Sequence, residues 1–150
     1  MRIGIGADHR GFRLKEELKK FLKGKNYQIK DFGTFSEEPC DYPDFAFPLS
    51  EALVKKKINR GILICGSGLG MTISANKVKG IRAALCLNKE MAKMARNHNN
   101  ANILVLAANF TSLKEAKKIV LTFLNENFEG GRHLRRINKI KNYENNSFSK

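Results

Sequence analysis

A cysteine followed by bare glycines is the first feature of this sequence that could do chemistry. Residues 61–72 read GILICGSGLGMT, so Cys65 ends a run of branched apolar residues and three glycines follow within five positions. The run predicts a buried strand, and the stretch after it predicts a helix beginning near Gly68. Free N–H groups and the helix dipole there lower a thiol pKa from about 8.5 to about 3.5–7.5. The pattern indicates a thiolate base, although a small buried cysteine in a tight turn is an equally good reading.

The residues after Cys65 suit an anionic ligand. Gly66, Gly68 and Gly70 lack side chains that would keep a ligand oxygen away from the backbone N–H groups. Ser67 can cap the helix, donate a hydrogen bond to the ligand, or do both. A Walker loop is excluded, because no lysine follows these glycines until Lys77.

Histidines and arginines elsewhere could supply proton transfer and phosphate binding. His9 follows one strand pattern and His98 precedes another, so both suit the edge of a site. The histidines lack the spacing of metal-ligand pairs, and the sequence predicts neither metal nor cofactor. Arg132 and Arg136 share one face of a predicted helix, where two guanidinium groups suit a phosphate. From these two residues alone, a solvated basic face is the favoured interpretation.

The elements that must position these residues alternate along the chain. Strands are expected at 2–7, 27–33, 60–65, 81–87 and 101–108. Helices are expected at 12–23, 47–57, 71–78, 88–97, 112–127 and 132–144. This alternation predicts an α/β fold, a Rossmann-like three-layer α/β/α sandwich with a five-stranded parallel sheet. Ligands of such sheets bind beyond the carboxyl ends of the strands, where Asp8, His9 and Cys65 stand.

Length and composition fit a single domain over residues 1–150, with the polar end 143–150 expected to fray. No apolar run approaches the roughly 20 residues of a membrane span, and no export signal is visible, so we expect a cytoplasmic protein. Three widely spaced cysteines argue against a disulfide framework. The formal charge of +14 is dispersed and not interleaved with aromatic residues, which favours compositional bias over a nucleic-acid site.

Five stretches together resemble the ribose/galactose isomerase family, which includes the type B ribose-5-phosphate isomerases and the galactose- and allose-6-phosphate isomerases. The stretches are GADHRGFRLK (6–15), CDYPDFA (40–46), GILICGSGLGMTISANKVKGIRAAL (61–85), RNHNNANIL (96–104) and EGGRHLRRI (129–137). The resemblance implies a metal-free aldose–ketose isomerisation through an enediolate. It also implies a homodimer or a dimer of dimers, with the active site between subunits. The expected partner is a phosphorylated sugar, and neither nucleic acid nor a membrane.

The resemblance also assigns roles to single residues. Cys65 matches the general base that moves a proton between C1 and C2, and His98 matches the residue that opens the sugar ring. Asp8 and Ser67 match residues that handle the sugar oxygens. The remaining matches are an anion-stabilising loop (Gly66, Ser67, Gly68, Leu69, Gly70), sugar or site-edge contacts (Asn99, Tyr42) and phosphate-binding positions (His9, Arg132, Arg136).

Two positions bear on the subtype. Cys65 together with Met71, where another branch of the family uses a glutamate, indicates the cysteine branch. Asn109 stands where many members carry an arginine, which leaves phosphate affinity and substrate preference open. The favoured substrate pair is ribose 5-phosphate and ribulose 5-phosphate. The alternatives are a 6-phosphohexose isomerase, a thiol hydrolase with His98 as its base, and a basic nucleic-acid-binding module using the last helix.

Overall fold

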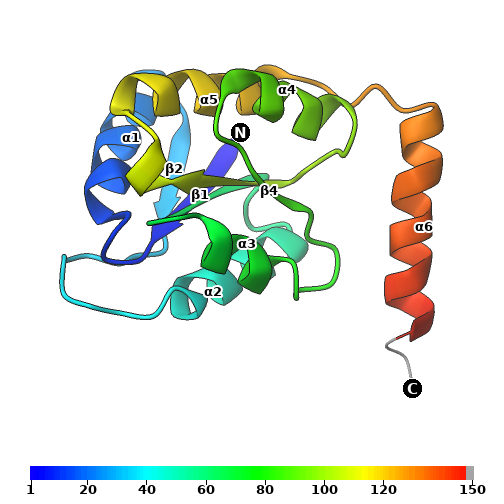
Figure 1. Ribbon diagram of the computed structural model, residues 1–150, viewed down its shortest axis with the longest axis horizontal. Coiled ribbons are helices and arrows are strands. Elements are labelled where there is room, and N and C mark those ends of the chain that lie inside the picture. Colours follow the sequence, from blue (N-terminus) through cyan, green and yellow to red (C-terminus); the bar gives the residue numbers. More distant parts are fainter. Residues whose placement is uncertain (148–150) are drawn as a thin grey trace.

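The computed structural model describes residues 1–147 and contains a parallel five-stranded sheet between two layers of helices (Figure 1). The strands are β1 (Arg2–Ala7), β2 (Gln28–Asp31), β3 (Arg60–Cys65), β4 (Ala83–Leu85) and β5 (Ile103–Ala107). Their order across the sheet is β2-β1-β3-β5-β4. The predicted Rossmann-like three-layer sandwich is confirmed.

Helices cover both faces of the sheet. One layer consists of α1 (Phe12–Gly24), α4 (Lys89–Asn97) and α5 (Leu113–Asn125). The other layer consists of α2 (Pro43–Val54) and α3 (Leu69–Ala75). The last helix, α6 (Arg132–Ser147), stands at one end of these layers (Figure 1). Within the described residues, no helix is both long and apolar enough to cross a membrane.

The sheet separates two hydrophobic cores, and the alternation of side chains along β3 sets the direction of Cys65. Successive side chains of a strand point to opposite faces. Ile62 and Ile64 accordingly join the core under α1, α4 and α5, whereas Leu63 and Cys65 join the core under α2 and α3. In the register of the sheet, Cys65 lies beside Ala107 of β5. The thiol therefore stands at the carboxyl edge of the sheet, on the side that α2 and α3 cover.

Some predicted boundaries are wrong. Helix α2 begins at Pro43 and ends at Val54, not over 47–57, because Pro43 starts the helix where a missing N–H costs nothing. The end expected to fray from residue 143 is helical through Ser147. Glu144 holds it against the body of the protein, since its Oε2 accepts the Gly80 N–H at 2.8 Å. Residues 148–150 of that prediction lie outside the described residues.

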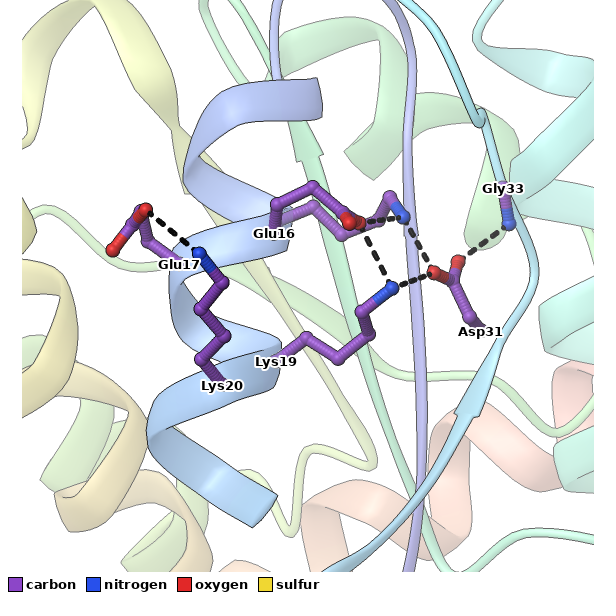
Figure 2. A network of polar contacts seen from close by, with 7 residues as sticks. Glu16, Glu17, Lys19, Lys20, Asp31 and Gly33 are labelled. Atoms are coloured by element: carbon purple, nitrogen blue, oxygen red, sulfur yellow. Dashed lines mark hydrogen bonds and ion pairs between the residues drawn. The ribbon is translucent and has the colours of Figure 1, made fainter. Parts of the chain in front are cut away.

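A buried ion cluster ties α1 to the end of β2 (Figure 2). The fully buried Lys15 brings its Nζ to 2.6 Å from Asp31 Oδ2 and 2.8 Å from Glu16 Oε2, and Lys19 Nζ lies 2.9 Å from Asp31 Oδ2. Asp31 Oδ1 accepts the Gly33 N–H at 2.8 Å. Burial raises the pKa of Asp31, but the two ammonium groups and the Gly33 N–H outweigh it and hold that pKa below its usual range.

Candidate active site

A cleft of about 330 Å³ opens at the carboxyl ends of β1 and β3. The predicted site residues that line it are Asp8, Tyr42, Cys65, Gly66, Ser67 and Gly70. The chain thus brings together residues from three separate motifs, as expected for the carboxyl edge of a parallel sheet. Arg10 and Asn109 complete the lining. Arg10 was not predicted as a site residue, although it stands directly after Asp8 and His9.

Cys65 lines this cleft and is buried, with a residue exposure of 4%. Backbone N–H groups of Met71, Gly68 and Gly70 lie near the sulfur and act to lower the pKa of the thiol, because they stabilise its anion. Burial nevertheless dominates and, together with the Asp8 carboxylate, raises the pKa of the Cys65 thiol above its ordinary value. The prediction of a depressed pKa is wrong for the single chain. Burial under α2 and α3 raises the pKa of Cys65 by more than the backbone N–H groups at the helix end lower it.

The turn between Cys65 and α3 depends on its glycines. Gly68 adopts φ +76°, a left-handed conformation that other residues rarely adopt. A Cβ on Gly70 would lie 2.5 Å from Tyr42 Cζ, so the Tyr42 ring packs directly over this glycine. Ser67 is half-buried, and its Oγ accepts the Leu69 N–H at 3.2 Å. Ser67 thus caps the turn and keeps its own O–H available to a ligand oxygen.

Asp8 is a buried carboxylate held at the start of α1. Its Oδ1 accepts the N–H groups of Arg10 and Gly11 at 3.0 and 3.1 Å. Its own N–H donates to Ile64 O at 3.2 Å, which joins the end of β1 to β3. Among the described residues Oδ2 makes no hydrogen bond, so this oxygen is open to a sugar hydroxyl.

His9 does not line the cleft but lies beside the loop that carries Tyr42. Its Nδ1 accepts the Cys40 N–H at 3.2 Å and lies 3.9 Å from Cys40 Sγ. In a neutral ring the proton therefore sits on Nε2, where it can be donated to an anion. The same loop is fixed at its start, because Ala7 exchanges hydrogen bonds with Gly33 O and Thr34 N, both at 2.7 Å.

Four predicted site residues do not reach the Cys65 cleft of the same chain, namely His98, Asn99, Arg132 and Arg136. His98 caps the end of α4, and Arg132 and Arg136 are exposed on α6. Asn99 lines a separate groove of about 720 Å³ beside α6. The single chain therefore divides the predicted site into two groups, one around Cys65 and one around His98 and α6.

His133 also belongs to the second group, although it was not predicted as a site residue. Its ring stacks on that of His98, with centroids 4.4 Å apart and planes 12° apart. Its Nε2 lies 3.6 Å from Glu129 Oε2, and the Glu129 N–H donates to Asn97 O at 3.0 Å. Burial, with His98 and Arg132 close by, lowers the pKa of His133, while Glu129 opposes that shift. An uncharged His133 is the state in which the two rings can stack without repulsion.

The ligand atoms of His98, Glu129 and His133 all lie within 4.8 Å of one another, which makes them a candidate metal cluster among the described residues. A nitrogen lone pair of histidine lies in the plane of its ring, and the planes of these two stacked rings are nearly parallel. The lone pairs do not converge on one point, so the cluster would have to rearrange to chelate an ion.

The fold is of the α/β class, and its cleft places a buried thiol beside backbone N–H groups at the carboxyl edge of the sheet. The chain belongs to the ribose/galactose isomerase family, whose model matches residues 3–140. Its sequence is 48% identical over 145 residues to the probable ribose-5-phosphate isomerase B of Mycoplasma genitalium, covering 95% of each chain. It is 40% identical over 139 residues to ribose-5-phosphate isomerase B of Escherichia coli, covering 93% of each.

Solved structures agree with this assignment. Ribose-5-phosphate isomerase B of Clostridium thermocellum has a TM-score of 0.96 at 50% identity, over 98% of this chain and 99% of that chain. The Mycoplasma genitalium enzyme with bound ribulose-5-phosphate has a TM-score of 0.93 at 46% identity, over 97% of both chains. The protein is thus an isomerase, and the hydrolase and nucleic-acid alternatives find no support in these comparisons.

Proposed function

We propose that the protein interconverts D-ribose 5-phosphate and D-ribulose 5-phosphate through an enediolate, with Cys65 as the general base. The observation that carries this proposal is the position of Cys65 at the end of β3, in one cleft with Asp8, Ser67 and the glycine turn. The relatives named ribose-5-phosphate isomerase B, one of them solved with ribulose-5-phosphate, support the choice of substrate.

The isomerisation transfers one proton between two carbons and one proton between two oxygens. The Cys65 thiolate removes the proton from C2 of the open-chain aldose, and negative charge develops on O1. The backbone donors of the 66–70 turn stabilise that oxyanion. The Cys65 thiol then returns the proton to C1, while the hydroxyl proton moves from O2 to O1 with help from Asp8 or Ser67. A raised pKa makes the thiolate scarcer but also a stronger base toward a weakly acidic C–H.

We also propose that two subunits complete each site. Ring opening needs an acid and a base near the ring oxygen, and phosphate needs cations, yet His98, Arg132 and Arg136 lie outside the Cys65 cleft of their own chain. Large apolar side chains near both groups favour an interface: Ile73 on α3 is 62% exposed and Met94 on α4 is 47% exposed. In the proposed homodimer, each cleft receives the partner subunit's His98, Arg132 and Arg136.

The direct test is an assay of the purified protein on ribose 5-phosphate, allose 6-phosphate and galactose 6-phosphate, beside a Cys65→Ala variant. We expect pentose turnover in the wild type and a kcat lower by about 10³-fold in the variant, within the usual contribution of a general base. Circular dichroism should report an unchanged fold. Variant activity within a few-fold of the wild type would remove Cys65 from the mechanism, and faster hexose turnover would overturn the choice of substrate.

A further inference from the structure

We propose that Arg10 binds the phosphate group of the substrate and thereby sets the preference for a phosphorylated sugar. The inference rests on the proposed function for the identity of the sugar, and on the geometry of the Cys65 cleft for the position of the anion. Arg10 lies outside the motif positions assigned to phosphate, which are His9, Arg132 and Arg136.

The Arg10 side chain packs against the turn that follows Cys65. A Cβ built on Gly66 would lie 3.0 Å from Arg10 Cδ and 3.0 Å from Asn109 Nδ2. The absence of a side chain at Gly66 therefore makes room for the aliphatic part of Arg10 against the turn. Arg10 is exposed and lines the cleft, so packing of this stem leaves the charged group accessible to a ligand.

The backbone of Arg10 is also fixed. Its N–H donates to Asp8 Oδ1 at 3.0 Å, and α1 begins two residues later at Phe12. A side chain on a fixed backbone loses less conformational entropy when it binds a ligand, so a contact from this position is favourable.

The charge of the cleft requires a cation. Its two formally charged side chains are Asp8 and Arg10, and Cys65 adds a second negative charge whenever it acts as a base. A sugar phosphate carries nearly two further negative charges at neutral pH. Without Arg10, the part of the cleft that one subunit supplies would repel its substrate.

Arg10 is free to make this contact. Among the described residues, its guanidinium has no hydrogen-bond or ion-pair partner, whereas Arg13 pairs with Glu37 and Arg96 donates to Ala101 O at 2.6 Å. A planar guanidinium matches two phosphate oxygens at once. His9, the preceding residue, can direct its Nε2 proton to the same group, so the two residues would form one phosphate-binding edge beside α1.

The experiment compares two variants of Arg10. Arg10→Met keeps the aliphatic part of the side chain and removes the charge, whereas Arg10→Lys keeps a charge but not the planar guanidinium that can bind two oxygens. Arg13→Met is the matched control, because it removes the same charge three residues away and outside the cleft. Kinetics on ribose 5-phosphate and on unphosphorylated D-ribose give the preference ratio. Titration calorimetry with inorganic phosphate gives a binding constant that does not depend on turnover.

We expect Arg10→Met to raise KM for ribose 5-phosphate and Kd for phosphate by about 10- to 100-fold, as for loss of a hydrogen bond to a charged group. The ratio of kcat/KM for ribose 5-phosphate over D-ribose should fall by a similar factor. Arg10→Lys should recover part of the loss, and Arg13→Met should match the wild type.

Two results would overturn the inference. One is an unchanged Kd for phosphate in Arg10→Met. The other is an equal loss on both sugars, carried by kcat, which would assign Arg10 to the reacting carbons. Failure of the proposed function looks different: the wild type would not turn over ribose 5-phosphate, yet phosphate affinity would still depend on Arg10.

Discussion

The ring of His98 stacks on the ring of His133, with centroids 4.4 Å apart, and this contact joins the end of α4 to the first turn of α6. The stack fixes the orientation of His98, the proposed acid and base of ring opening. Glu129 supports it from the side, 3.6 Å from His133 Nε2. A positioned imidazole is needed where the sugar ring opens but not where the proton moves between carbons.

His98→Asn should therefore slow turnover of ring-forming substrates selectively. We expect kcat on ribose 5-phosphate to fall by about 10²-fold, within the usual contribution of acid–base catalysis. Turnover of erythrose 4-phosphate, whose blocked 4-hydroxyl prevents furanose formation, should stay within a few-fold. His133→Ala should give the same selectivity with a smaller loss, because it only loosens the ring of His98. Equal losses on both substrates would contradict the role in ring opening.

The raised pKa of Cys65 predicts slow alkylation at neutral pH. Only the thiolate reacts with iodoacetamide, so the rate at Cys65 should rise with pH and reach its midpoint above that of an ordinary thiol, about 8.5. Peptide mapping by mass spectrometry follows each cysteine separately. Cys86 should remain unmodified, since burial raises its pKa to about 12. Fastest modification of Cys65 near pH 7, levelling off there, would mean that the backbone donors outweigh burial.

Gly70→Ala should destabilise the protein through a collision with the Tyr42 ring. The added methyl would lie 2.5–2.7 Å from three ring atoms, and such overpacking costs about 1–3 kcal/mol of unfolding free energy. In a Tyr42→Ala background the cost should largely disappear, which a double-mutant cycle measures by urea denaturation. Gly24→Ala is the matched control, because nothing lies within 4 Å of its added methyl. Equal costs in both backgrounds would show that Tyr42 is not the obstacle.

Lys15→Met should remove much of the stability that the buried ion cluster contributes. Breaking a buried ion pair costs about 3–5 kcal/mol of unfolding free energy. Because Asp31 keeps its contacts with Lys19 and the Gly33 N–H, we expect a loss near the lower end of that range. Lys20→Met, which removes only an exposed pair with Glu17 at 3.8 Å, should cost less than about 1 kcal/mol.

The pH dependence of this loss follows from Asp31. Its folded pKa lies below the unfolded value, so its stabilising contribution is complete above about pH 4 and is lost as pH falls through the folded pKa. The difference between wild type and Lys15→Met should therefore shrink on acidification in urea melts. A difference that stays constant down to pH 2 would assign it to packing instead of charge.

Much of the architecture could be predicted from the apolar runs. The apolar runs RIGIGA and RGILIC do not alternate with polar residues as half-exposed strands would. Together with the amphipathic stretches between them, they predict a parallel sheet covered on both faces. The cleft was also predictable, because Asp8 and Cys65 each follow a strand. Boundaries such as the start of α2 at Pro43 depend on local turn geometry that periodicity does not report.

Tertiary contacts account for what the sequence did not reveal. The Cys65 pKa depends on how deeply α2 and α3 bury the sulfur, and no local pattern gives that depth. The His98–His133 stack joins segments that are distant in the chain. Arg10 stood within a recognised motif, but only its position over Gly66 indicates a ligand contact.

In the proposed dimer, Cys65 of one chain works with the partner subunit's His98. Mixing two nearly inactive variants, Cys65→Ala and His98→Asn, after reversible dissociation tests this arrangement. If both residues serve one site across the interface, half of the random dimers carry one intact site, so activity should return to about a quarter of the wild-type value. Native mass spectrometry confirms that mixed dimers have formed. Mixed dimers without recovered activity would contradict the claim, because each chain would then need its own Cys65 and His98.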